Sequence, residues 1–131
     1  MSILTDVING KSDLVSGNQA TDIEIENAEK ILNVKFANDY KEYLRNYGFI
    51  CYDGHELTGI CKGKRLDVIN VTLKEKEYNL NIPKEAYVIE QAHIDGIVIW
   101  QSENGEIYQS QGDNYMKLCN SLFEYINLFQ N

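Results

Sequence analysis

Two cysteines and a histidine lie near one another in the sequence, and these residue types bind zinc or form a nucleophile with its base. His55 follows Cys51 by four positions and precedes Cys61 by six. A tetrahedral zinc site needs a fourth ligand, which would have to come from a distant residue such as His93 or Cys119. A catalytic thiol needs a base that activates it, and no feature of this segment marks one. We therefore expect partly buried thiols and a turn histidine, with no metal site and no cofactor.

Two pairs of carboxylates could perform acid–base chemistry if burial raised the pKa of one member. These pairs are Asp53 with Glu56 and Glu103 with Glu106. Both lie near predicted turns, where solvent is the default surrounding. The segment GICKGKR (59–65) places glycines beside bases but lacks the GxxxxGK[ST] pattern of a phosphate-binding loop. We interpret it as a solvated basic turn, and we predict that the chain is not an enzyme.

The charge of the 131-residue chain is unevenly distributed along its length. The net charge is −8, which argues against binding nucleic acid or an anionic membrane by simple attraction. Residues 62–84 hold six bases and three acids, whereas residues 85–131 hold seven acids and one base. One interpretation is acidity for solubility alone. The sharper one is a negatively charged face that attracts a basic partner.

The length and the apolar runs predict one domain over residues 1–131, of which 1–20 form an arm or short helix. The first residues show no basic start followed by an apolar run, so no secretory signal is expected. The longest apolar run, GIVIW (96–100), is far shorter than a membrane-spanning helix. We therefore expect a cytoplasmic protein.

A pair of helices is predicted between residues 21 and 48. Thr21 and Glu24 have the spacing of a capping box, and Asn33 ends the first helix. Its apolar face is predicted to be Ile25, Ala28, Ile31 and Leu32. Asn38 is predicted to cap the second helix and Gly48 to close it in the left-handed conformation. The apolar face of that helix is Tyr40, Tyr43, Leu44 and Tyr47, while Val34 and Phe36 anchor the corner.

Strands are predicted to follow Gly48. The glycine-punctuated stretch FICYDGHELTGICKG (49–63) is expected to form short extended pieces and turns. RLDVINVTL (65–73) is rich in β-branched residues and is predicted to be a strand, followed by a polar connection or short helix. Three further strands are predicted, at EAYVIEQA (85–92), GIVIWQ (96–101) and EIYQSQ (106–111).

The last two of these strands are predicted to form a hairpin across Asn104-Gly105, in a two-residue type I′ turn. In that register Trp100 faces Gln109, and Ser102 faces Ile107. One side then carries Val98, Trp100 and Ile107, and the other carries Ile97, Ile99 and Tyr108. Apolar residues on both sides are typical of an inner strand covered on each face.

The C-terminal segment has two interpretations. One long helix from Tyr115 would align Leu118, Leu122 and Phe129. Alternatively, NYMKLC (114–119) is an edge strand and a helix begins at Ser121, whose spacing to Glu124 repeats the capping box. We predict the second arrangement, with Phe129 on the apolar face of the helix. The predicted class is α+β: an N-terminal helical hairpin, a mostly antiparallel sheet and a C-terminal helix.

The segment IEIENAEKILNVKFANDYKEYLRNYGFI (23–50) resembles the N-terminal signature of the SUKH superfamily, also called the Smi/Knr type. GHELTGI (54–60), AYVIEQAHIDGIVIWQSENGEIYQ (86–109) and NSLFEYI (120–126) resemble family segments in the same order. The chain departs from the pattern at Ala37, where proline is usual, and at Tyr47-Gly48, where the family has a glycine pair. Both departures lie at helix ends and affect cap geometry more than the fold.

The resemblance implies an α+β fold and a role without catalysis. Bacterial members of the superfamily are typically immunity proteins that bind and neutralise secreted toxins, often nucleases, whereas fungal members regulate the cell wall. The expected partner is therefore a basic toxin domain, with no nucleic acid and no membrane. A cytosolic scaffold or regulator and a small-ligand binding domain with a pocket near Trp100 are the alternatives.

Partner contacts are predicted where acids and aromatic residues lie on turns, since tyrosine and tryptophan are frequent in binding hot spots. The predicted partner-binding residues are Asp53, His55, Glu56, Trp100, Glu103, Glu106, Tyr108 and Asp113.

Overall fold

The computed structural model describes residues 2–79 and 81–128 and has five helices and seven strands among them. The chain begins with α1 (Ile3–Asn9), β1 (Val15–Ser16), α2 (Asp22–Leu32) and α3 (Asn38–Tyr47). It continues through β2 (Ile50–Tyr52), β3 (His55–Leu57), α4 (Val68–Lys76) and β4 (Tyr87–Gln91). It closes with β5 (Val98–Gln101), β6 (Ile107–Gln111), β7 (Asn114–Cys119) and α5 (Leu122–Leu128). The predicted α+β class is confirmed.

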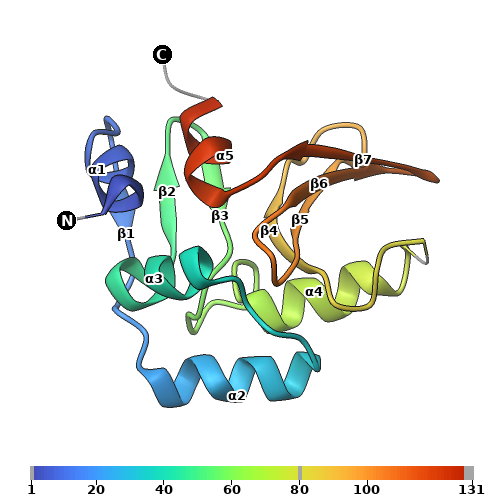
Figure 1. Cartoon of the computed structure of the whole chain (residues 1–131), viewed down its shortest axis with the longest axis horizontal. Helices are drawn as coiled ribbons and strands as arrows, with labels where there is room; N and C mark the ends of the chain where they lie inside the picture. The colour runs from blue at the N-terminus through green and yellow to red at the C-terminus, as the bar shows by residue number, and fades with distance from the viewer. Residues whose placement is uncertain (1, 80, 129–131) are drawn as a thin grey trace.

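All seven strands belong to one antiparallel sheet, in which each strand pairs with the next in sequence from β1 to β7. Figure 1 shows this sheet curving strongly, with α4 across its hollow side and the other helices gathered toward the N-terminal strands. All four residues of β5 are buried, as expected for an inner strand covered on both faces. β1 and β7 are the two edges.

The sheet separates two hydrophobic clusters. The larger one joins the N-terminal helices and α5 to one face and contains Tyr40, Tyr43, Ile99 and Ile107. The smaller one lies against α4 and consists of Val71, Ala86, Val88, Val98 and Trp100. Because both faces are covered along the inner strands, apolar side chains alternate to both sides of β5.

The predicted helical hairpin is confirmed, with corrections at its ends. Thr21 and Glu24 form the capping box, and Asn33 ends α2 in the left-handed conformation. Ile31 was expected on the buried face but is 50 % exposed, because α2 buries only the narrow stripe of Ile25, Ala28 and Leu32. Val34 and Phe36 are buried in the corner between the two helices, as predicted.

Asn38 does not cap α3, which differs from the prediction. Ala37 occupies the N-cap position without a side-chain bond, and its N–H donates to the Tyr87 hydroxyl at 2.9 Å. Burial of Phe36 and Ala37 fixes the entry into α3, so Asn38 becomes the first helical residue. Gly48 has the expected positive φ of 74° but a ψ of −60°, outside the left-handed helical region. A Cβ there would lie 2.0 Å from the Asn18 carbonyl oxygen, so the close backbone approach also requires glycine.

Residues 65–73 were predicted to be a strand, and this is wrong. α4 occupies Val68–Lys76, and its buried residues Val68, Val71 and Thr72 recur at helical spacing. The Thr72 hydroxyl accepts the N–H of Val88 at 3.0 Å, which fastens the helix to β4. Packing against the sheet therefore overrides the weak preference of β-branched residues for strands.

The β5–β6 hairpin forms where predicted but in a different register. Trp100 pairs with Tyr108 and Gln101 with Ile107, so the loop holds three residues, 103–105, closed by the bond from Ser102 N–H to the Glu106 carbonyl. Gly105 alone among the three has a positive φ (93°), which is typical of a type I turn followed by a bulge and excludes the type I′ turn. Because β6 is shifted by one residue relative to the predicted register, its side chains lie on the opposite faces of the sheet. Tyr108 therefore shares a face with Trp100, and Ile107 shares a face with Ile99.

The C-terminal prediction of an edge strand followed by a helix is confirmed. The Ser121 hydroxyl accepts the N–H of Glu124 at 3.1 Å, while the Glu124 carboxylate accepts the N–H of Asn120. Leu122, Tyr125 and Ile126 are the buried residues of α5. Phe129 lies outside the described residues. Within residues 2–79 and 81–128, the helices are too short and too polar for any of them to cross a bilayer.

Candidate partner-binding surface

The predicted partner-binding residues do not form one site. The strand register places the β2–β3 turn, the β4–β5 loop and the β6–β7 turn at one end of the sheet, and the β5–β6 hairpin loop at the other. Asp53, His55, Glu56 and Asp113 therefore lie toward one end, and Glu103 and Glu106 lie at the opposite end. Trp100 is fully buried, and its indole N–H donates to Ser110 Oγ at 2.9 Å. It cannot face a partner, because it packs against α4 as part of the core.

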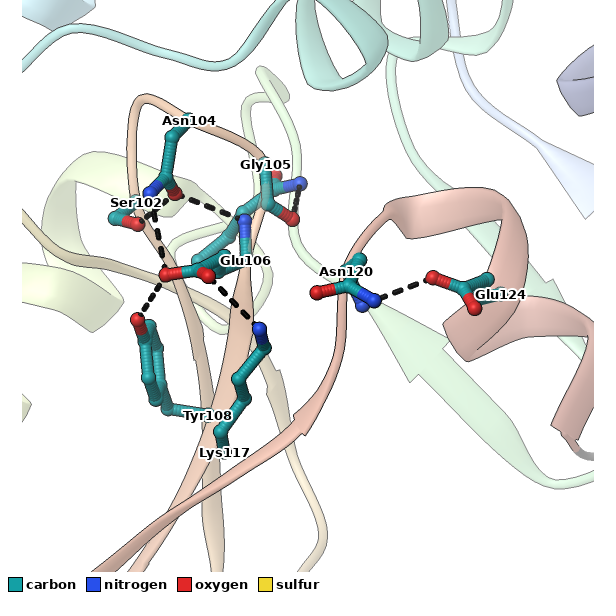
Figure 2. Close-up of polar contacts among 9 residues, drawn as sticks. Ser102, Asn104, Gly105, Glu106, Tyr108, Lys117, Asn120 and Glu124 are labelled. Atoms are coloured by element: carbon teal, nitrogen blue, oxygen red, sulfur yellow. Dashed lines mark hydrogen bonds and ion pairs between the residues drawn. The ribbon is translucent and has the colours of Figure 1, made fainter.

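Glu106 is the centre of a polar cluster on the hairpin (Figure 2). Its Oε1 accepts the Tyr108 hydroxyl at 2.5 Å and the Asn104 side-chain amide at 3.1 Å, and its Oε2 lies 2.8 Å from Lys117 Nζ. The bond from Lys117 is the largest cause that lowers the pKa of Glu106 to about 2. The bond to Glu106 in turn raises the pKa of Tyr108 to about 12. Glu106 is therefore a stably ionised carboxylate and is not suited to donate a proton.

The loop of the hairpin is held by its own polar side chains. Asn104 Oδ1 accepts the N–H of Glu106 at 3.0 Å and the hydroxyl of Ser102 at 2.7 Å. Figure 2 shows this asparagine folded back over the loop toward Glu106. These bonds present a fixed loop on which the neighbouring Glu103 is exposed.

Gln101 and Asp39 tie the hairpin to the helices, and no local sequence motif indicates either role. The Gln101 side-chain amide donates to Asp39 Oδ1 at 3.0 Å and to the Gly105 carbonyl at 3.1 Å, while its Oε1 accepts the Tyr87 hydroxyl. The other oxygen of Asp39 accepts the N–H of Leu122 at 2.8 Å. These bonds link α3, the hairpin and the start of α5 into one rigid unit.

The other predicted group, on β3, is also engaged within the molecule. Glu56 accepts two bonds from Arg65, at 2.5 and 2.8 Å, and this contact lowers the pKa of Glu56. His55 Nδ1 lies 3.0 Å from Glu90, a buried carboxylate that also accepts the Tyr125 hydroxyl. His55 therefore links β3 to β4, and Glu56 holds the loop before α4, whereas Asp53 is the exposed residue of the set at that turn.

Two exposed carboxylates, Glu85 before β4 and Glu103 in the β5–β6 loop, line the same hollow. In the described part of the chain, neither Glu85 nor Glu103 has a basic group within ion-pair distance. Both line a hollow of about 620 Å³ whose far side, formed by α2, the corner after it and α3, carries Lys30, Lys35 and Lys41. Glu85 also contributes to the raised pKa of Tyr115, for which burial is the larger cause.

A pair of tyrosines lies near Glu85, which acts electrostatically on both of them. The rings of Tyr108 and Tyr115 stack with centroids 5.0 Å apart and planes 19° apart, and Tyr115 is 37 % exposed. Sequence reasoning singled out Tyr108 and missed Tyr115 and Glu85. The two-residue Gly112–Asp113 turn, which aligns Tyr115 beside Tyr108, is a hairpin signal that could have found the pair.

The cysteines show no feature of a catalytic or metal-binding site. All three are free, and burial raises the pKa of each thiol, so they remain protonated near neutral pH. Over residues 2–79 and 81–128, no three His, Cys, Asp or Glu side chains are grouped so that they could hold a metal ion.

Comparison with known proteins identifies the family. A family model described as SMI1-KNR4 cell-wall, SUKH_5, matches residues 3–129. A comparison with curated proteins gave no match. The match covers nearly the whole chain, and the α+β arrangement with its C-terminal helix is consistent with a SUKH-like fold. The chain therefore belongs to the SMI1-KNR4 family of the SUKH superfamily.

Proposed function

We propose that this protein is a cytoplasmic immunity protein, which binds a cognate secreted bacterial toxin and blocks it by covering its surface without catalysing any reaction. A nuclease is the kind of toxin that suits it best. Membership of the SUKH superfamily supports this role, because bacterial members of the superfamily are typically immunity proteins.

The observation that carries the proposal is the pair of exposed acids, Glu85 and Glu103, which line one hollow and form no ion pair in the described residues. A nuclease holds nucleic acid on a basic surface, so a protein of net charge −8 is attracted to that surface and can occlude it. Glu85 and Glu103 are available for such attraction, because within the described residues no base lies within ion-pair distance of either of them. The stacked tyrosines near Glu85 supply the rigid aromatic contacts that dominate binding energy in many interfaces.

The test uses the toxin domain encoded beside this protein. Co-expression of the toxin domain with this protein is expected to yield a complex that co-purifies. Addition of one equivalent of this protein is expected to abolish the activity of the toxin domain. The association rate is expected to fall steeply as salt rises from low to physiological concentration. Binding that is insensitive to salt and to charge reversal at Glu103 would contradict the electrostatic mechanism. Turnover of a substrate by this protein would contradict the proposal as a whole.

A cellular scaffold or regulator is the second candidate, and the cell-wall description of the matching family favours it. The two candidates differ in their partner. If the protein is an immunity protein, a strain that lacks it is expected to grow normally in the absence of the toxin and to be inhibited when the toxin is present. A cell-wall defect in the absence of any toxin would favour the regulator.

A further inference from the structure

We propose that β7 is the docking edge of the molecule, and that a basic, extended strand of the toxin pairs with it. This inference deepens the proposed function and rests on it. β7 ends the sheet, is six residues long and exposes its first four residues, Asn114 to Lys117. Figure 1 shows it along the outer margin of the curved sheet, with α5 beyond its C-terminal end only.

The strand register shows which backbone N–H and C=O groups of β7 do not bond to β6. Gln111 and Asn114 flank the two-residue Gly112–Asp113 turn and therefore form a hydrogen-bonded pair. Tyr115 opposite Ser110 and Lys117 opposite Tyr108 are then non-hydrogen-bonded pairs, which turn their own N–H and C=O groups away from β6. After Lys117 a bulge interrupts the ladder, so these two residues define the open edge.

The charges around this edge select the occupant. Lys117, the only lysine or arginine after residue 84, is already bound by Glu106 at 2.8 Å. Asp113 begins the edge, and Glu85 acts on Tyr115, so the field that a docking strand meets is negative. A second copy of this chain would bring another net charge of −8 to the same edge, which disfavours self-pairing. A basic strand is the complementary occupant.

A small pocket beside the edge fits the same partner. It has a volume of about 170 Å³ and is lined by Asp113, Asn114 and Tyr115 on one side and by Tyr78 and Asn79 on the other. A lysine or arginine projecting from the docked strand would lie there against a carboxylate and tyrosine rings, which favour cations electrostatically. Main-chain bonds to the edge would supply affinity, and this pocket would supply selectivity.

Hydrogen exchange tests the proposal directly in the wild-type protein. The probe is the toxin domain encoded beside it. In the free protein, the amides of Tyr115 and Lys117 are expected to exchange fast and that of Met116, which is bonded to β6, slowly. In the complex, the Tyr115 and Lys117 amides are expected to become protected by at least tenfold. Complex formation that leaves both amides unprotected would overturn the inference while the proposed function stands. No binding by the wild type would overturn both.

A matched pair of variants separates the backbone from the side chain. Tyr115→Pro removes the outward N–H, whereas Tyr115→Ala keeps it, and both lose the ring. Because proline is tolerated on an edge where the N–H faces solvent, Tyr115→Pro is expected to stay folded. It is expected to bind the toxin domain about tenfold more weakly than Tyr115→Ala, the upper range for one hydrogen bond. Equal affinities of the two variants would overturn the inference. So would amide protection in the protein alone that rises with its concentration, since this would identify a second copy as the occupant.

Discussion

Glu106 shows how a single side chain can look like a catalytic candidate and be committed to structure. Its carboxylate accepts bonds from Asn104, Tyr108 and Lys117. Each of these donors favours the ionised form, and together they keep the group charged at every physiological pH. The same three bonds orient Tyr108, which is half of the exposed tyrosine stack.

The titration of Glu106 is therefore a prediction at the residue scale. Its carboxyl carbon signal is expected to titrate near pH 2 in the wild type, because its pKa is lowered to about 2, chiefly by Lys117. Lys117→Met is expected to move the midpoint toward the ordinary glutamate value of about 4.3. Since the pKa is lowered on folding, the stability that Glu106 contributes is present above the ordinary pKa and is lost as pH falls toward 2.

Lys62→Met, which removes a base from a different loop, is the control and is expected to leave the Glu106 midpoint unchanged. Carbon-13 NMR of the carboxyl group measures both variants. A wild-type midpoint near 4 would show that the cluster does not hold in solution.

Trp100 marks the limit of sequence reasoning for single residues. Its alternation with apolar neighbours indicated a strand buried on both faces, which is confirmed. Which aromatic residue stays exposed depends on what covers each face, and α4 was not recognised as a helix. The stack of Tyr108 and Tyr115 joins residues on different strands, so it follows only from the β6–β7 register, for which the Gly112–Asp113 turn was the available signal.

Helix caps are a feature of the element scale, and they give the second prediction. Thr21→Ala is expected to lower the free energy of unfolding by about 1 kcal/mol, because the Thr21 hydroxyl accepts the N–H of Glu24 in the capping box of α2. Asn38→Ala is the matched control. It is expected to change stability by less than about 0.5 kcal/mol, since Asn38 is the first helical residue of α3 and Ala37 holds the cap position. Urea unfolding measures both, and an equal loss in the two variants would contradict the observed caps.

The elements that local rules describe could be predicted, and those that distant contacts decide could not. The capping box of α2 and the strand–helix order at the C-terminus involve neighbours in sequence, and both are confirmed. The β5–β6 register depends on Gln101, which bonds to Tyr87 and Asp39 across the fold. The helical spacing of Val68, Val71 and Thr72 was present in the sequence, but their β-branched side chains concealed it.

At the scale of the whole molecule, the net charge of each segment could be predicted, but the positions of the charged side chains in the fold could not. The acidic surplus of residues 85–131 is a property of the sequence. The structure divides the predicted acids between two ends of a sheet and neutralises Glu56 and Glu106 with Arg65 and Lys117. Glu85, which has no ion pair in the described residues, is distant in sequence both from Glu103, with which it lines one hollow, and from Tyr115, on which it acts. Long-range folding alone brings such groups together.

Two turn aspartates test which side of the molecule meets the toxin. Asp113 adjoins β7, whereas Asp53 precedes β3, four strand positions away in the sheet order. At about 4.8 Å per strand the separation is roughly 19 Å, more than two Debye lengths at physiological salt, which are about 8 Å each. Asp113→Asn is expected to slow association with the toxin domain about two- to threefold, since one charge about 8 Å from another in water contributes roughly 0.5 kcal/mol.

Asp53→Asn is expected to leave that rate unchanged, and it is a fair control, because asparagine tolerates the positive φ of 47° at position 53. Stopped-flow association rates at two salt concentrations measure both variants, and the difference between them should shrink as salt is added, because the charge of Asp113 acts through solvent. If the rate instead falls with Asp53→Asn and not with Asp113→Asn, the toxin approaches the β2–β3 turn. The edge of β7 would then be an exposed strand that its own charges and bulge protect from pairing, as edges are protected in many sheets.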